Sequence, residues 1–175
     1  MRVIKANVST GEAMVPLYRT QLVREAEVAT AWRAGELDRS GYPQVKDPDT
    51  AVQIMENLFQ MSARDKEIFA CLMLDTKNRI IGVTKISEGS LNSSIVHPRE
   101  VFKPALIAGA ASIVVAHNHP SGDPAPSRED IEVTRRLCEA GRLLGVDLLD
   151  HVIIGYEGTV PGSPGFLSMK QKGLM

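Results

Sequence analysis

Residues 111–130 have the sequence ASIVVAHNHPSGDPAPSRED, and this stretch decides how the centre of the chain folds. Its first part, ASIVVA, is rich in β-branched residues and uninterrupted, which is typical of a short buried strand. The middle is rich in proline, glycine and aspartate, which predicts a loop. Ser127 is suited to cap the helix that follows. The stretch therefore predicts a strand, a loop and a helix in succession.

Three side chains of this stretch have the spacing of a metal site. His117 and His119 are two residues apart, and residues two apart in a strand point to the same side. Asp130 would be brought to the same end by the helix. Two nitrogen ligands and one oxygen ligand leave the fourth position of a catalytic zinc ion open for water. The alternative is a chance His-x-His pair in a surface loop, with Ser127 and Asp130 forming only a capping box.

The wider run over residues 116–137, AHNHPSGDPAPSREDIEVTRRL, resembles the RadC branch of the JAB/MPN metalloprotease superfamily. His-x-His, seven residues, Ser, two residues and Asp form the core of the JAMM motif of that superfamily, and HNHPSG distinguishes the RadC branch. Three other segments are similar to RadC-like sequences: FACLMLDTKNRI at 69–80, EGSLNSSIVHPREVF at 88–102 and LLDHVIIG at 148–155. The resemblance covers about residues 50–175 and does not extend to the first 45 or so.

The resemblance implies an α/β (α+β) fold with a mixed central β-sheet flanked by helices, the JAB/MPN-like and cytidine-deaminase-like architecture. The residue patterns agree with it. Apolar periodicity predicts helices at 48–61, 98–110 and 128–144, and apolar or β-branched runs predict strands at 68–74, 79–87, 90–96, 111–117, 146–154 and 166–169. Asp47 is suited to cap the first helix. In the second helix, Pro104 predicts a late start or a kink, and Gly109 falls on its apolar face.

The first 46 residues differ in character from the rest. Residues 1–8 alternate enough to form a strand, and residues 21–33 are rich in Ala, Glu and Arg, which predicts a short helix. Residues 35–46 contain the glycines and proline of a linker. We therefore expect an N-terminal extension over residues 1–46 and a RadC-like JAB/MPN metallohydrolase domain over residues 47–175.

Composition limits the class of protein. The chain has 175 residues, of which 43% are hydrophobic and 23% charged, as in an ordinary globular protein. A net charge of −1 gives no global attraction to nucleic acid or to an anionic membrane. Cys71 and Cys138 form no CxxC pattern, and two buried free thiols are usual in a reducing cytoplasm. No run approaches the ~20 apolar residues of a membrane span, and residues 1–14 lack the apolar stretch of a signal peptide. We expect a cytoplasmic protein.

Zinc in such a site would lower the pKa of its bound water from near 16 towards roughly 7, which leaves a general base and an oxyanion donor to be found. In JAMM proteases the base is an upstream glutamate, and the resemblance implies Glu67, at the start of the strand predicted over residues 68–74. A charged residue that merely ends a strand at the surface is the alternative, and Glu88 and Glu100 are competitors. In the family's pattern the Ser127 hydroxyl stabilises the tetrahedral intermediate, a role compatible with capping the helix.

Other polar residues near the motif have simpler explanations. Asn118 could orient substrate, but turn formation is the favoured interpretation. Asp123 lies in a Gly-Asp-Pro turn that accounts for it. The neighbouring Asp150 and His151 could support a metal ligand from behind, although a hydrogen-bonded structural histidine is favoured. His97 fits a helix-entry turn.

The leading functional expectation is a zinc-dependent peptidase or isopeptidase, acting on a peptide or protein substrate that could include a ubiquitin-like protein. One alternative is a DNA-repair-associated protein of the RadC type acting on or with DNA. The near-neutral charge opposes it, as does the lack of a helix-hairpin-helix pattern in residues 1–45. The other alternative is a non-catalytic JAB interaction scaffold, which retention of all three ligands opposes. The substrate and the oligomeric state stay open.

Overall fold

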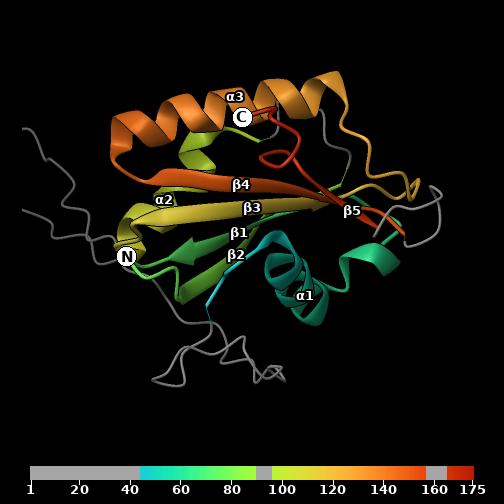
Figure 1. The fold of residues 1–175 in the computed structure, drawn as a ribbon, viewed down its shortest axis with the longest axis horizontal. Helices are drawn as coiled ribbons and strands as arrows, with labels where there is room; N and C mark the ends of the chain where they lie inside the picture. The colour runs from blue at the N-terminus through green and yellow to red at the C-terminus, as the bar shows by residue number, and fades with distance from the viewer. Residues whose placement is uncertain (1–43, 90–95, 157–164) are drawn as a thin grey trace, which may run out of the picture.

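The computed structural model describes residues 44–89, 96–156 and 165–175. Their centre is a five-stranded sheet with the order β2-β1-β3-β4-β5 (Figure 1). The strands are β1 (Ile68–Leu74), β2 (Ile80–Glu88), β3 (Ser112–Asn118), β4 (Asp147–Ile154) and β5 (Phe166–Ser168). The helices are α1 (Pro48–Phe59), α2 (Pro98–Ala108) and α3 (Arg128–Leu144), with a 3-10 turn at Met61–Ala63. This mixed sheet flanked by helices is the expected fold class.

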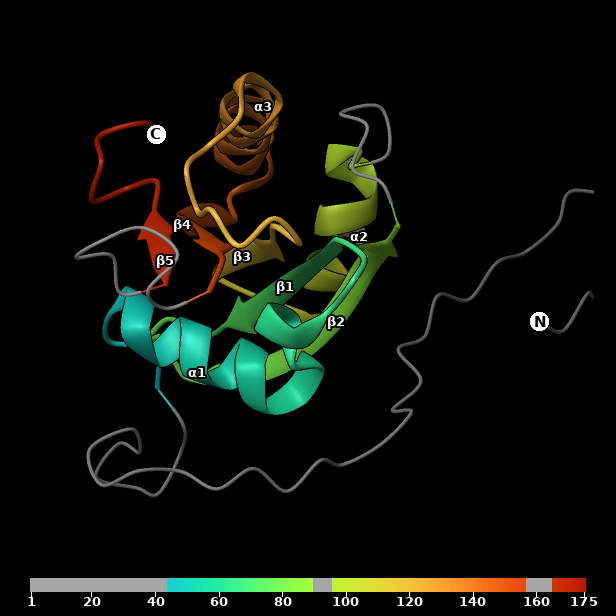
Figure 2. The same ribbon diagram turned by 90° about the vertical axis from the view of Figure 1, so that its right-hand side faces the viewer.

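The sheet is the middle layer of three. Helix α1 covers one face, and α2 and α3 cover the other (Figures 1 and 2). All residues of β1 and β3 are buried. In β3, Val114 and Ala116 pack into the core on the α1 side, whereas Ile113 and Val115 pack into the core beneath α2 and α3. Burial on both faces explains why these strands are continuous apolar runs rather than alternating ones.

The segments that contain the JAMM-like motif lie at one end of the sheet. Strands β3 and β4 are parallel and are joined by α3, so the loop between β3 and α3 lies at the carboxyl end of β3. Strand β1 runs antiparallel to β3, with Phe69 paired with His117, so β1 begins at this same end. The start of β1, the end of β3 and the N-terminus of α3 therefore lie together.

Most of the predicted elements are confirmed, and their ends follow the capping residues. Helix α3 has the predicted bounds, with Ser127 as N-cap and Gly145, at a φ of 68°, as C-cap. Helix α1 is capped by Asp47, whose carboxylate accepts a 2.8 Å hydrogen bond from the Thr50 N–H. It ends at Phe59 rather than residue 61, because Gln60 adopts a left-handed conformation with a φ of 50°.

Helix α2 departs from the prediction at both of its special residues. It begins at Pro98, as predicted, and continues through Pro104, so of the two alternatives given for Pro104 the late start is wrong and the kink stays a prediction. The backbone hydrogen bond that Pro104 cannot make would go to the carbonyl of Glu100, in an exposed first turn where solvent can replace it. Gly109 does not lie on the apolar face of the helix. It follows Ala108 as a left-handed C-cap with a φ of 69°.

Several expectations concern other parts of the chain. The strand predicted over residues 1–8, the helix over residues 21–33 and nearly all of the strand over residues 90–96 lie outside the described residues. The end of the predicted linker is packed against the domain, because Val45 is buried and its N–H donates a 2.9 Å hydrogen bond to the Asn78 carbonyl. The boundary between residues 46 and 47 stays a prediction.

The expectations for the thiols and for the membrane can be compared with the described residues. Cys71 and Cys138 are both free thiols. Cys71 is buried as expected, and its burial raises the thiol pKa to about 12. Cys138 is only partly buried. Within the part of the chain that the structure describes, no helix has the length and apolar character needed to cross a membrane.

Candidate metal centre

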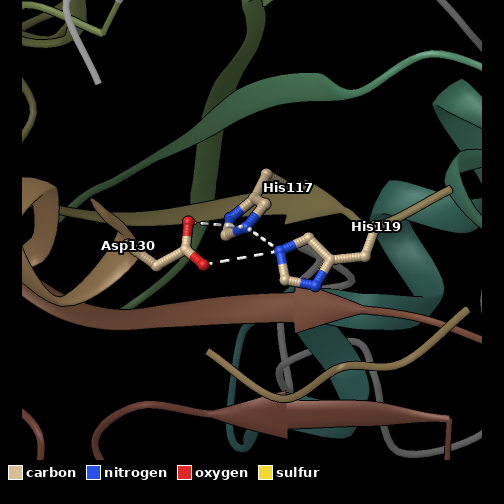
Figure 3. Close-up of side chains that lie close together, drawn as sticks. All are labelled: His117, His119 and Asp130. Carbon is tan, nitrogen blue, oxygen red and sulfur yellow. Dashed lines mark hydrogen bonds and ion pairs between the residues drawn. The ribbon is translucent and has the colours of Figure 1, made fainter. Parts of the chain in front are cut away.

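His117, His119 and Asp130 meet at the carboxyl end of β3 (Figure 3). The Nε2 atoms of the two histidines are 3.0 Å apart. Asp130 Oδ1 lies 3.1 Å from His117 Nε2, and Asp130 Oδ2 lies 3.4 Å from His119 Nε2. The His117 side chain is fully buried, whereas 14% of the His119 side chain and 11% of the Asp130 side chain are exposed. The three side chains predicted as ligands thus form one cluster, which solvent reaches beside His119 and Asp130.

The N-terminus of α3 holds Asp130 in this cluster. Ser127 caps the helix, accepting a 3.1 Å hydrogen bond from the Asp130 N–H through its hydroxyl. In return, Asp130 Oδ2 accepts hydrogen bonds from the Ser127 N–H at 2.7 Å and from its hydroxyl at 2.6 Å. The capping box and the candidate metal site, which the sequence left as alternatives, are therefore compatible, because the capping box uses Oδ2 while Oδ1 faces His117.

The loop between β3 and α3 orients the ring of His119. Its Nδ1 lies 2.8 Å from the carbonyl oxygen of Asp123, which can only accept a hydrogen bond, so Nδ1 carries the proton. In the neutral ring the Nε2 lone pair then points at His117 and Asp130. The Asp123 carboxylate accepts from the Ala125 N–H, as expected of a turn residue.

The three side chains fit a metal ion because their hydrogen-bond acceptor atoms lie close together. The His119 lone pair and the Asp130 carboxylate converge on one point, and each is an atom type that divalent metals bind. Acceptors 3.0–3.4 Å apart repel one another unless a proton or a cation lies between them. These three residues could hold a metal ion.

The pKa shifts of Asp130 and His119 also favour a positive charge between the three side chains. Burial raises the pKa of Asp130, but hydrogen bonds with His117 and His119 outweigh it and hold the pKa of the carboxyl well below its usual range. Burial lowers the pKa of His119, but the hydrogen bonds that its protonated ring donates to Asp130 and to the Asp123 carbonyl, with the charge of Asp130, raise the pKa overall. The charge of Glu67 acts in the same direction. The cluster is therefore electrostatically suited to a cation.

Glu67 lies beside the cluster, just before β1. Because Phe69 pairs with His117 in the antiparallel ladder, continuing the register by two residues brings Glu67 level with His119. Residues two apart share a face, so Glu67 lies on the same face as Phe69, whose ring stacks with that of His117 at a centroid distance of 6.0 Å. The charge of Glu67 acts on His119, where it raises the pKa of the ring. The structure thus brings the predicted base next to the predicted ligands.

The competing acids have other partners. Glu88, at the end of β2, forms an ion pair with Lys85. Glu100, in the first turn of α2, pairs with Arg99 through a 3.2 Å contact. His97 occupies the N-cap position of α2, as expected for a helix-entry turn. Glu67 is the stronger candidate for a catalytic base because its charge acts on His119.

Asn118 has a role that the sequence did not reveal. The turn-forming interpretation is wrong, because Asn118 is the last residue of β3 and is buried. Its side-chain oxygen accepts a 2.7 Å hydrogen bond from the Ile68 N–H, and its side-chain nitrogen donates a 3.1 Å hydrogen bond to the Lys66 carbonyl. One amide thus clamps the backbone on both sides of Glu67. The only signal in the sequence was a polar amide at the end of a buried strand, where it needs partners.

His151 also has a closer connection to the site than expected. It is buried and hydrogen-bonded, as a structural histidine would be, but its Nε2 lies 2.8 Å from Nδ1 of His117. Its Nδ1 lies 2.6 Å from the Thr134 hydroxyl. Burial holds the pKa of His151 well below its usual range, so the ring is neutral. The Asp150 carboxylate binds elsewhere, accepting a 2.6 Å hydrogen bond from Ser168.

Comparison with known proteins agrees with this fold and site. The RadC-like JAB domain family matches residues 45–174. A UPF0758 protein of Bacillus cereus (strain Q1) is 44% identical over 169 residues, which is 94% of this chain and 71% of the relative. UPF0758 proteins of Bacillus anthracis (strain A0248) and Bacillus thuringiensis subsp. konkukian (strain 97-27) are each 45% identical over 170 residues, with the same coverage. The mixed sheet and its helices form a JAB-like α+β fold. The chain belongs to the RadC-like JAB domain family.

The similarity to these relatives is longer than expected. Because their alignments span 94% of this chain, they include most of residues 1–44. The match to the RadC-like JAB domain family begins at residue 45, as expected, whereas the similarity to these relatives extends further towards the N-terminus. The name UPF0758 states no activity, so function has to be argued from the site.

Proposed function

We propose that this chain is a zinc-dependent hydrolase of peptide or isopeptide bonds. His117, His119 and Asp130 would hold the zinc, Glu67 would act as general base, and Ser127 would stabilise the oxyanion. The observation that carries the proposal is the convergence of two imidazole nitrogens and a carboxylate, all within 4.8 Å of one another, at a point with access to solvent. Membership of the RadC-like JAB domain family supports it.

The donor set favours zinc. Two imidazoles and one carboxylate are a common ligand set of catalytic zinc, and three protein ligands leave one position open. When bound, zinc supplies a water with a pKa lowered to roughly 7 and a Lewis acid for the scissile carbonyl. We propose a peptide or protein as the substrate. Any contribution of residues 1–46 to substrate recognition is likewise a proposal.

Glu67 would move the protons of the reaction. Its carboxylate would accept a proton from the attacking water and return it to the leaving amine. Its position before β1, level with His119, supports this role because a general base must lie within hydrogen-bond reach of the water. The Asn118 clamp holds the backbone of Glu67 in place for both transfers.

Ser127 would stabilise the oxyanion by donating a hydrogen bond from its hydroxyl. In this structure the hydroxyl donates to Asp130 Oδ2 at 2.6 Å. To stabilise an oxyanion, the O–H would turn from the carboxylate towards the substrate oxygen. The Ser127 N–H, which also donates to Oδ2, would keep Asp130 in place during this rotation.

The clamp on Glu67 can be tested by Asn118→Asp. The new carboxylate still accepts from the Ile68 N–H but can no longer donate to the Lys66 carbonyl, so the backbone beside Glu67 shifts. Because a misplacement of about 1 Å can cost about 100-fold in rate, we expect a loss of kcat of that order with zinc content unchanged. Steady-state kinetics and metal analysis of the same sample measure both. A wild-type kcat would show that the clamp does not position the base.

The activity itself is tested with zinc-loaded protein, a library of quenched fluorescent peptides and isopeptide-linked ubiquitin-like conjugates. We expect hydrolysis that a chelator abolishes and added zinc restores. Hydrolysis that persists after complete removal of metal would contradict the proposal. Protein that carries zinc, cleaves no amide and binds duplex or single-stranded DNA at low salt would instead favour the DNA-associated alternative.

A further inference from the structure

A buried series of hydrogen bonds runs behind His117, on the side away from the metal cluster. His117 Nδ1 lies 2.8 Å from His151 Nε2, and His151 Nδ1 lies 2.6 Å from the Thr134 hydroxyl. That hydroxyl donates a 2.6 Å hydrogen bond to the backbone carbonyl of Asp130. The side chains of His117, Thr134 and His151 have no exposure to solvent. The series therefore begins at one proposed ligand and ends at the backbone of another.

The chemistry of the partners fixes the direction of each hydrogen bond. The Asp130 carbonyl can only accept, so the single hydroxyl proton of Thr134 points to it. The Thr134 oxygen must then accept from the other neighbour, which means that His151 carries a proton on Nδ1. The proton of Thr134 thus decides the tautomer of His151.

The tautomer of His151 in turn decides that of His117. His151 is fully buried, and its ring nitrogens contact a hydroxyl and an imidazole rather than a carboxylate, so a charged ring would be costly. A neutral ring with its proton on Nδ1 has a lone pair on Nε2. That lone pair accepts from His117 Nδ1–H, which leaves the His117 lone pair on Nε2, facing Asp130 and His119.

We propose that Thr134 and His151 are positioning residues that set the tautomer of His117, so that its Nε2 is always available to the metal. This inference rests on the metal site of the proposed function and deepens it. The fold explains how the arrangement arises. Thr134 lies one helical turn after Asp130 on α3, and His151 lies on β4, the parallel neighbour of β3. The unit β3-α3-β4, which carries His117 and Asp130, therefore also carries the residues that set the tautomer of His117.

If the hydrogen bond between His151 and His117 ran in the opposite direction, it would oppose metal binding. Without the Thr134 hydroxyl, His151 could carry its proton on Nε2 and donate it to His117 Nδ1. The neutral His117 would then carry its own proton on Nε2, at the position where the metal has to bind. Partners that hold the far nitrogen of a metal-binding histidine typically contribute about 10- to 100-fold to metal affinity.

The first test compares Thr134→Val with Thr134→Ser. Valine has nearly the shape of threonine but no hydroxyl, whereas serine keeps the hydroxyl. In a competition titration with a chromophoric zinc chelator, we expect Thr134→Val to bind zinc about 10- to 100-fold more weakly, and Thr134→Ser to keep most of the wild-type affinity. Equal zinc affinity of Thr134→Val and wild type would overturn the inference.

The second test needs no variant and therefore does not depend on whether Thr134→Val folds. Nitrogen-15 NMR of the metal-free wild-type protein distinguishes the two tautomers of each ring. We expect His117 and His151 both to carry their protons on Nδ1, and wild-type protein with His117 protonated on Nε2 alone would overturn the inference. Protein that shows the expected tautomers and binds zinc but cleaves no amide would contradict the proposed hydrolase activity and leave this inference standing.

Discussion

Glu67→Gln should lower kcat for amide hydrolysis by about 10²–10⁴-fold, the usual contribution of a general acid or base, while the protein retains its zinc. Glutamine has the size and shape of glutamate but cannot accept the proton of the attacking water. The side chain is not one of the three proposed ligands, and the Asn118 hydrogen bonds on either side of it go to the backbone, so the substitution leaves them in place. Steady-state kinetics with metal analysis of the same preparation measure both quantities.

Glu88→Gln is the matched control for this prediction. Glu88 lies opposite Ile68 at the end of β2, near the same end of the sheet, but its carboxylate pairs with Lys85. Its removal should leave kcat close to that of the wild type. A wild-type kcat in Glu67→Gln, or an equal loss in both variants, would contradict the assignment of Glu67 as the base.

His119→Ala should weaken zinc binding by more than the roughly 10- to 100-fold that loss of an outer hydrogen-bond partner costs, because it removes one of the proposed ligands itself. His119 lies just beyond β3 and is the most exposed of the three proposed ligands, so the variant should still fold. The competition titration measures the affinity. At a zinc concentration about 100 times the wild-type Kd, zinc should add about 2.7 kcal/mol to the free energy of unfolding of the wild type. It should add little to that of the variant.

His97→Ala provides the matched histidine control. His97 precedes α2, and its side chain makes no capping hydrogen bond to the helix. This variant should bind zinc as the wild type does and gain the same stabilisation from it. If His119→Ala gained as much stability from zinc as His97→Ala, the ion would be bound elsewhere.

Local patterns in the sequence were sufficient to predict the elements that carry the proposed ligands. The run before His117 is apolar because β3 is buried on both faces, which makes it recognisable as a central strand. Ser127 and Gly145 mark the two ends of α3 because each satisfies backbone groups that a helix leaves unpaired. The spacing of His117 and His119 then predicted the convergence of their rings directly.

The supporting residues could not be predicted in this way, because their partners are distant in the sequence. Asn118 binds the backbone of residues 66 and 68, and that contact exists only because β1 and β3 pair in one particular register. His151 meets His117 through the pairing of β3 with β4. Thr134 looked like an ordinary helix residue. No local pattern marks such contacts, since register is set by the whole sheet.

A crystal structure of the zinc-loaded protein, with anomalous diffraction recorded on both sides of the zinc absorption edge, tests the central claim most directly. The expected result is one zinc peak bound by Nε2 of His117, Nε2 of His119 and the carboxylate of Asp130, with the Glu67 carboxylate beside the open position. A zinc peak held by other residues, or no peak among these three side chains, would contradict the assignment of the metal centre.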